Sequence, residues 1–272
     1  MNKYISDVNK RIEEYKIRLE NTERISLGRS ILGADIDCYK VGAGKKNIVG
    51  IGSHSGTEHV TALHLFDFIA FMTDNATRYS THYGINIEFL LQKFTFWIIP
   101  CPNPDGLKLH LLSGFDNPLR ERQMRMGAGN YSSWRYNARG VDLGKNYRYG
   151  HSRLFSSDRG GSGNLGYPGE YPESEPETRS IASFVRALLP SALISFRLGE
   201  GIFCVDRKSI AEKIGVKTGV PVSVADGNSL FGELYSYTAV SLKIPSFSIG
   251  IRADENVSDR VKKTLVLLPT YL

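Results

Sequence analysis

The spacing of hydrophobic residues along the chain predicts helices that alternate with strands. Residues 3–20 carry apolar side chains three and four positions apart, which is the spacing of an amphipathic helix. Further helices are expected from residue 57 to about 72, at about 175–188 and at roughly 256–268. Short apolar runs bounded by turn residues predict strands within residues 31–42, 45–52, 86–100, 192–198, 201–205 and 244–251. This alternation is typical of an α/β domain with a mostly parallel sheet.

The region from residue 103 to residue 172 lacks this periodicity and is rich in Gly, Tyr, Asn and Arg. We therefore expect long loops there, which in compact domains are usually functional or face a ligand. Between Lys108 and Arg159 the chain has ten Lys and Arg against four Asp and Glu, which accounts for the whole excess of 34 basic over 28 acidic residues. Such a surface could contact nucleic acid or an anionic peptide or glycan, although solvated loops are the simpler interpretation.

The composition is that of a globular protein. Its 272 residues are 41% hydrophobic and 23% charged, which excludes disordered and fibrous classes. No apolar run approaches the ~18 residues of a membrane helix, and the N-terminal segment lacks the apolar stretch of a signal peptide. The three cysteines, Cys38, Cys101 and Cys204, are too few and too far apart for a disulfide framework. We therefore expect a cytoplasmic protein with no membrane partner.

The most polar cluster in the apolar N-terminal half runs from His54 to His59 and includes Glu58. Imidazole and carboxylate groups suit zinc, but a catalytic zinc needs three protein ligands and an open position. All six histidines lie between residues 54 and 151, which excludes a site completed by a C-terminal histidine. A glycine pattern at residues 50–56 matches a dinucleotide-binding turn only weakly, and no GxSxG serine motif occurs.

The order of motifs resembles the zinc carboxypeptidase family, especially its bacterial branch that cuts peptidoglycan peptides at γ-D-glutamyl bonds. The resemblance covers nearly the whole chain and rests on six segments, which contain GIGSHSGTEHVTA, WIIPCPNPDGL, WRYNARGVDLGKNY, YPGEYPESEPETRSIASF, LISFRLGEGIFC and KIPSFSIGI. It implies one domain over residues 1–272, with a central mixed, mostly parallel, twisted sheet and helices on both faces. It also implies that residues 103–172 form substrate loops.

The same resemblance implies that the family's metal and catalytic residues are lost. The first metal motif, His-x-x-Glu, has Ser55 in place of its histidine and keeps only Glu58. The second metal histidine corresponds to Arg197, and the catalytic glutamate corresponds to Gly250. Without the metal the pKa of a bound water is not lowered toward neutrality, and without the glutamate there is no general base. We therefore expect an inactive peptidase homologue with no cofactor.

Positions that bind substrate are better kept. By resemblance, Arg135 contacts a substrate carbonyl, and Asn137 lies in the same motif. Lys145 stands where the family binds the substrate carboxylate with an Asn-Arg pair, and it can attract a carboxylate as a point charge. Either Tyr235 or Tyr237 corresponds to the family's mobile tyrosine.

Two further charged residues are expected to change role once the metal is lost. Asp142 corresponds to a residue that orients a metal-binding histidine, and a structural hydrogen bond is its expected role here. Arg197 is expected to replace zinc as the partner of Glu58, because a guanidinium group suits a carboxylate and a buried unpaired carboxylate is costly.

Three functions are consistent with these residues. The favoured hypothesis is an inactive homologue that binds a peptide or muropeptide through Arg135, Lys145 and the basic loops. The second is an active metallopeptidase with a rebuilt zinc site of His54, Glu58 and His59. The third is a scaffold or nucleic-acid-binding protein that uses the basic loops, and its affinity would fall steeply with salt.

Overall fold

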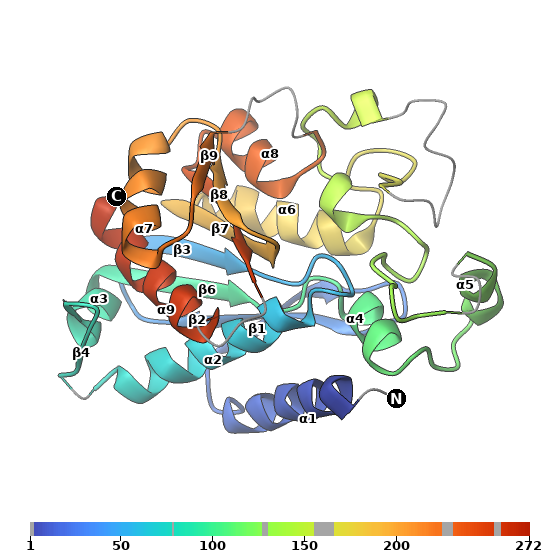
Figure 1. The fold of residues 1–272 in the computed structure, drawn as a ribbon, viewed down its shortest axis with the longest axis horizontal. Helices are drawn as coiled ribbons and strands as arrows, with labels where there is room; N and C mark the ends of the chain where they lie inside the picture. The colour runs from blue at the N-terminus through green and yellow to red at the C-terminus, as the bar shows by residue number, and fades with distance from the viewer. Residues whose placement is uncertain (1–2, 78, 127–129, 155–165, 225–230, 253–256) are drawn as a thin grey trace.

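The structure is a computed structural model that describes residues 3–77, 79–126, 130–154, 166–224, 231–252 and 257–272. Within these residues an eight-stranded sheet crosses the molecule in the order β1-β2-β6-β3-β7-β10-β8-β9 (Figure 1). Its strands are β1 (Arg24–Arg29), β2 (Asp35–Val41), β3 (Lys46–Ile51), β6 (Phe94–Ile99), β7 (Ala192–Leu198), β8 (Gly201–Cys204), β9 (Val222–Val224) and β10 (Ser246–Ile251). A separate small hairpin pairs β4 (Thr81–His82) with β5 (Ile85–Asn86).

The centre of the large sheet is parallel and its flanks are mixed. Strands β6, β3, β7 and β10 are parallel neighbours, and β8 pairs with β9 in the same way. The pairs β1–β2, β2–β6 and β10–β8 are antiparallel. This arrangement confirms the predicted α/β fold with a mixed, mostly parallel sheet.

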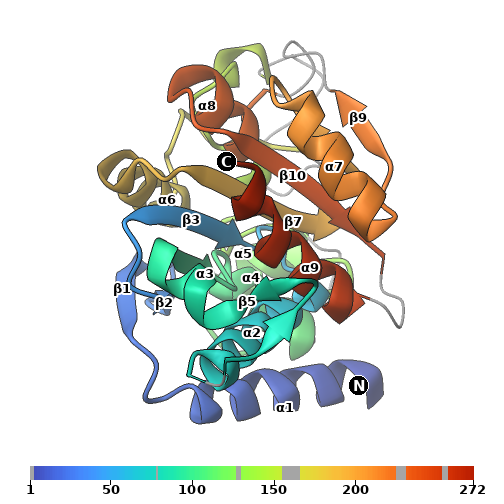
Figure 2. The same ribbon diagram turned by 90° about the vertical axis from the view of Figure 1, so that its left-hand side faces the viewer.

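Helices cover both faces of the sheet, as the resemblance implied (Figures 1 and 2). Side chains from α1, α2, α7 and α9 share one hydrophobic core with the sheet, while α6 and α8 share the other. The helices are α1 (Lys3–Arg18), α2 (His59–Asn75), α3 (Ile87–Lys93), α4 (Pro104–Leu111), α5 (Arg120–Met126), α6 (Pro176–Leu188), α7 (Lys208–Thr218), α8 (Leu234–Ser241) and α9 (Val257–Leu267), with 3₁₀ turns η1 (Leu143–Lys145), η2 (His151–Leu154) and η4 (Leu268–Tyr271). None of them, over the described ranges, is long and apolar enough to cross a membrane.

The strand residues divide between the two cores with the alternation expected of a strand that is covered on both sides. Ile48 of β3 packs in the core beneath α2, and its neighbour Val49 packs in the core beneath α6. Ile194 and Leu193 of β7 divide in the same way. Strands buried on both faces read as continuous apolar runs, which is why they could be predicted from the sequence.

Two sequence predictions are wrong because short capped helices interrupt them. The segment 86–100 is a strand only from Phe94, since Asn86 accepts a hydrogen bond from the backbone N–H of Phe89 (2.8 Å) and begins α3. The predicted loop region 103–172 contains α4 and α5. Asn103 caps α4 by accepting a hydrogen bond from the N–H of Gly106 (3.0 Å), and Pro104 occupies the first helical turn.

Candidate functional site

A cavity of about 140 Å³ lies at the carboxyl ends of β3 and β7. In open α/β sheets this edge is where ligands bind. Residues that precede α2 form one wall, the loop that contains η1 forms a second, and the start of α8 forms a third. The charged residues that line it are Glu58, Arg135, Asp142, Lys145, Arg197 and Glu233.

Glu58 fixes the start of α2 to the end of β7. Its carboxylate accepts hydrogen bonds from the backbone N–H of Ser55 (3.1 Å) and the backbone N–H of Leu198 (3.2 Å). Burial raises the pKa of Glu58 to about 7, because the surrounding protein solvates the charged form less well than water does. The hydroxyl of Ser55 is engaged with the hydroxyl of Thr57 at 2.9 Å.

Arg197 does not pair with Glu58, so the prediction that it replaces zinc as the partner of this carboxylate is wrong. Its guanidinium carbon lies 4.3 Å from the ring centroid of Phe203, in β8 just after the turn that follows β7. In the described part of the chain, no ion pair within 4.0 Å joins it to any carboxylate. Glu58 accepts two backbone N–H groups, and the guanidinium group of Arg197 packs on an aromatic ring, so neither side chain holds the other in place.

His54 and His59 point to different surroundings. The Nε2 atom of His54 lies 2.9 Å from the hydroxyl of Tyr147 in the cavity wall, and burial lowers the pKa of His54 to about 4. The ring of His59 stacks on that of His110, with centroids 5.3 Å apart. Among the described residues, no group of three or more His, Cys, Asp or Glu is arranged to hold a metal ion. The alternative site of His54, Glu58 and His59 is therefore not assembled.

The loop that contains η1 contributes both signs of charge. Asp142 accepts a hydrogen bond from the N–H of Gly144 (3.2 Å), which is a structural hydrogen bond of the expected kind, and burial raises the pKa of its carboxyl group. Lys145 donates to Glu233 at 2.7 Å, so the charge of this lysine is neutralised within the cavity. Arg135 is exposed at the rim and has no ion pair within 4.0 Å in the described structure.

The remaining candidate residues differ in whether they line the cavity. Tyr235 lines the cavity, whereas the hydroxyl of Tyr237 accepts a hydrogen bond from Arg186 (3.0 Å) outside it. Asn137 is fully buried away from the cavity, and its amide group donates to Glu175 at 2.7 Å. Sequence reasoning did not single out Tyr147, although it ends the motif that contains Lys145.

Gly250 does not line the cavity and has no room for a side chain. It pairs with Gly201 across the β10–β8 ladder. A Cβ atom at this position would lie 2.6–2.9 Å from three backbone atoms of Glu200, a distance that real Cβ atoms essentially never show. The turn between β7 and β8 therefore occupies the space that a larger side chain at position 250 would need.

The residues present do not fit the zinc ion that the resemblance implies. The Ser55 hydroxyl is a poor zinc ligand, and both oxygens of Glu58 accept backbone N–H groups. Arg197 adds a permanent positive charge to the same cavity, where it would repel a dication. The donor set is thus suited to anions and cationic organic groups rather than to a metal.

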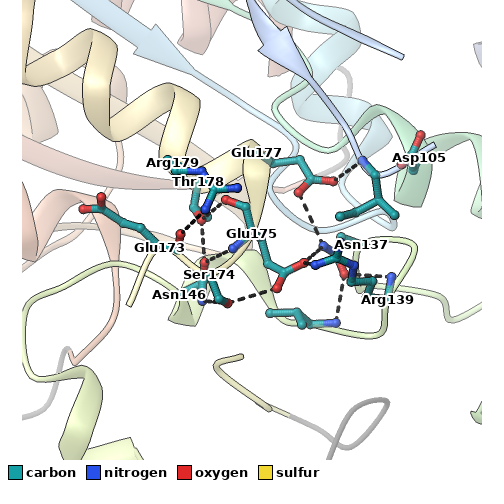
Figure 3. A network of polar contacts seen from close by, with 12 residues as sticks. Asp105, Asn137, Arg139, Asn146, Glu173, Ser174, Glu175, Glu177, Thr178 and Arg179 are labelled. Atoms are coloured by element: carbon teal, nitrogen blue, oxygen red, sulfur yellow. Dashed lines mark hydrogen bonds and ion pairs between the residues drawn. The ribbon is translucent and has the colours of Figure 1, made fainter. Parts of the chain in front are cut away.

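A buried polar network holds Asn146, the residue that follows Lys145 (Figure 3). Its centre is the side-chain amide of Asn146, which is fully buried. This amide donates to Pro168 O (2.6 Å), Tyr171 O (3.2 Å) and Ser174 Oγ (2.9 Å), and accepts from Glu175 N (3.2 Å) and Thr178 Oγ1 (2.5 Å). The loop is therefore joined to the start of α6 by interior hydrogen bonds.

Glu177, in the same network, should make folding stability depend on pH. It is fully buried, and burial raises its pKa from 4.5 to about 7, with Glu175 and Asp105 as nearby carboxyl groups that add to the shift. Because the folded state then binds the proton more tightly, stability is greatest below the unfolded pKa and falls as pH rises from 4.5 to about 7.

Glu177→Gln should remove about 3 kcal/mol of this decline. Urea unfolding near pH 5 and near pH 8 measures this decline in the free energy of unfolding, and the exposed Glu121→Gln is the control. If the free energy of unfolding fell by the same amount between the two pH values in both variants and in the native chain, the assignment would be contradicted.

The basic residues between 108 and 159 are partly neutralised by acids from outside that segment. Arg148 pairs with Glu173 at 2.8 Å, and Arg139 lies 3.8 Å from Glu175. Lys108 lies 4.4 Å from the ring centroid of Phe115. Arg159 lies outside the described residues. Together with the Lys145–Glu233 pair, these ion pairs offset part of the excess positive charge of the segment.

Residues 9–200 match the family model described as zinc carboxypeptidase, which is well over half of the chain. The chain belongs to the zinc carboxypeptidase family. A γ-D-glutamyl-L-diamino acid endopeptidase of Lysinibacillus sphaericus is 25% identical over 164 residues, or 59% of this chain and 41% of that protein. A metallocarboxypeptidase A-like protein of Trichophyton verrucosum (strain HKI 0517) is 28% identical over 178 residues, or 64% of this chain and 37% of that protein. The matches thus span less than half the length of these two proteins.

Solved structures of other proteins share the fold. Thrombin activatable fibrinolysis inhibitor aligns with a TM-score of 0.76 at 18% identity, covering 98% of this chain and 73% of that one. The murein-tripeptide amidase of Escherichia coli O157 aligns with a TM-score of 0.60 at 18% identity, covering 91% of this chain and 90% of that one. At these identities the likeness establishes the fold alone.

Proposed function

We propose that this zinc carboxypeptidase family member binds a carboxylate-bearing peptide of the peptidoglycan class and does not hydrolyse it by a zinc mechanism. The observation that carries the proposal is a pair of guanidinium groups, Arg135 and Arg197, at one cavity. Neither has an ion-pair partner among the described residues. A guanidinium group presents several N–H donors in a plane, which matches a carboxylate ligand.

The absence of hydrolysis follows from the chemistry of three positions. Ser55 and Arg197 supply no metal ligand, so the pKa of a water molecule here would not be lowered toward neutrality. At Gly250 there is no carboxylate to serve as general base, and the backbone of Glu200 leaves no space for one. These losses act on the same step, and restoring one of them would not restore the others.

The peptide class is taken from the relatives. One matched protein is named as an endopeptidase for γ-D-glutamyl-L-diamino acid bonds, and one solved structure is named as a murein-tripeptide amidase. Murein tripeptide, named in the second, is a short peptide with free carboxylates. A ligand of this kind supplies the anionic group that the two guanidinium groups require.

Calorimetric titration with murein tripeptide in excess EDTA tests the proposal. We expect saturable binding, and no cleavage products by mass spectrometry with or without added zinc. Arg197→Ala should weaken binding about 10- to 100-fold, because a hydrogen bond to a charged group contributes about 1.5–3 kcal/mol. Arg24→Ala, a surface arginine that pairs with Asp37, is the matched control and should bind normally. Cleavage of the tripeptide, or binding that EDTA abolishes, would overturn the proposal.

A further inference from the structure

Among the described residues, two carboxylates at the cavity make no ion pair within 4.0 Å, and neither do its two guanidinium groups. The hydrogen-bond partners of Glu58 are the N–H groups of Ser55 and Leu198, and that of Asp142 is the N–H of Gly144. Neither carboxylate lies within 4.0 Å of a Lys or Arg nitrogen in the described structure. The third acid of the cavity, Glu233, is already paired with Lys145.

The cavity therefore holds two carboxyl groups and two guanidinium groups that make no ion pair within 4.0 Å in the described structure, although Arg135 acts electrostatically on both carboxyl groups. A ligand with only a carboxylate would neutralise Arg135 and Arg197 but would bury Glu58 and Asp142 further from water, which is costly for unpaired carboxylates. A ligand with only an ammonium group would leave the two guanidinium groups without an anionic partner. A ligand that carries both groups on neighbouring atoms offsets both costs at once.

We propose that the site recognises a zwitterionic amino-acid terminus, with its carboxylate at Arg135 and Arg197 and its ammonium group at Glu58 and Asp142. This inference rests on the proposed function and names the end of the peptide that enters the cavity. An ammonium group donates three hydrogen bonds. Each oxygen of Glu58 accepts only one backbone N–H and keeps a lone pair for it, and one oxygen of Asp142 accepts none in the described structure.

The size of the cavity agrees with an end group rather than a whole peptide. Its volume of about 140 Å³ is well below the ~300 Å³ at which typical sites for drug-sized ligands begin. One amino-acid terminus can enter, and the rest of the peptide would extend past the exposed Arg135 toward solvent. The ammonium group thereby occupies the side of the cavity where Glu58 remains from the family's metal motif.

The test compares three forms of the murein tripeptide by calorimetric titration in EDTA. The first has its terminal diamino acid free, the second has the terminal ammonium group acetylated, and the third has the terminal carboxylate amidated. We expect the acetylated and amidated forms each to bind about 10- to 100-fold more weakly than the free form. Acetylation should cost less affinity in Glu58→Gln than in the native chain, because that variant has already lost one of the two carboxylates that bind the ammonium group.

The matched control is Glu13→Gln, an exposed residue of α1 that pairs with Lys16 outside the cavity. It should keep the full difference between the free and acetylated forms. Equal binding of the free and acetylated forms, with loss of the amidated form, would overturn the zwitterion assignment and leave the proposed function intact. Absence of binding by all three forms would overturn the proposed function itself. Asp142→Asn should reproduce the effect of Glu58→Gln; normal discrimination by both variants would also contradict the assignment.

Discussion

Gly250→Glu, which restores the carboxylate of the family's catalytic position, should lower the free energy of unfolding by about 3 kcal/mol or more without producing hydrolysis. The reason is steric. The new Cβ atom would lie 2.6–2.9 Å from backbone atoms of Glu200, and backbone cannot rotate aside as the end of a side chain can. The turn between β7 and β8 would have to move, and with it the Leu198 N–H that binds Glu58. Urea unfolding and a tripeptide cleavage assay measure the two effects.

Gly144→Ala is the matched control for this glycine substitution. A Cβ atom there would meet only Asp142 Oδ1, at 3.3 Å, and that carboxylate can shift by a few tenths of an ångström. We expect a change of less than about 1 kcal/mol in the free energy of unfolding. If Gly250→Glu folded as stably as Gly144→Ala, or cleaved the tripeptide, the packing of the β7–β8 turn would not be what prevents a catalytic carboxylate.

Asn146→Ala should destabilise the protein by about 3–5 kcal/mol. Its buried amide serves five hydrogen-bonding groups between the cavity loop and α6, and each buried group left without a partner costs about 1–3 kcal/mol. The total is smaller than the sum of these penalties, because some of the groups can move and form hydrogen bonds to water. Thermal and urea unfolding provide the measurement.

Asn86→Ala offers a comparison in which an asparagine makes one cap hydrogen bond at an exposed site. Its expected cost is about 1 kcal/mol. Similar losses from the two variants would mean that the network in Figure 3 contributes no more than an ordinary helix cap. A larger loss from Asn146→Ala, together with weaker tripeptide binding, would link the network to the position of Lys145.

Local patterns explain which elements could be predicted from the sequence. The helix at the N-terminus and α6 have clear apolar stripes, and the central strands are continuous apolar runs, so periodicity was sufficient for them. In contrast, α8 is buried on all sides from Leu234 to Ala239 and has no polar face to indicate its period. The short helices α3 and α4 depend on single Asn caps within segments that otherwise read as strand and turn.

The candidate site shows a similar division. Motif order indicated Glu58, Arg135, Lys145 and Arg197, and all four line one cavity. Their partners could not be predicted, because the competing groups come from elsewhere in the fold: a backbone N–H at Leu198, the ring of Phe203 and the carboxylate of Glu233. The family comparison establishes membership, whereas these contacts determine what charge the cavity presents.

Titration of chelator-stripped protein with zinc, followed by titration of the zinc-treated and untreated samples with murein tripeptide, tests most directly whether this cavity is an organic ligand site rather than a metal centre. We predict no stoichiometric zinc binding that depends on Glu58, and equal tripeptide affinity in both samples. One equivalent of zinc that is lost in Glu58→Gln, together with tripeptide binding or cleavage only in the zinc-treated sample, would contradict the account.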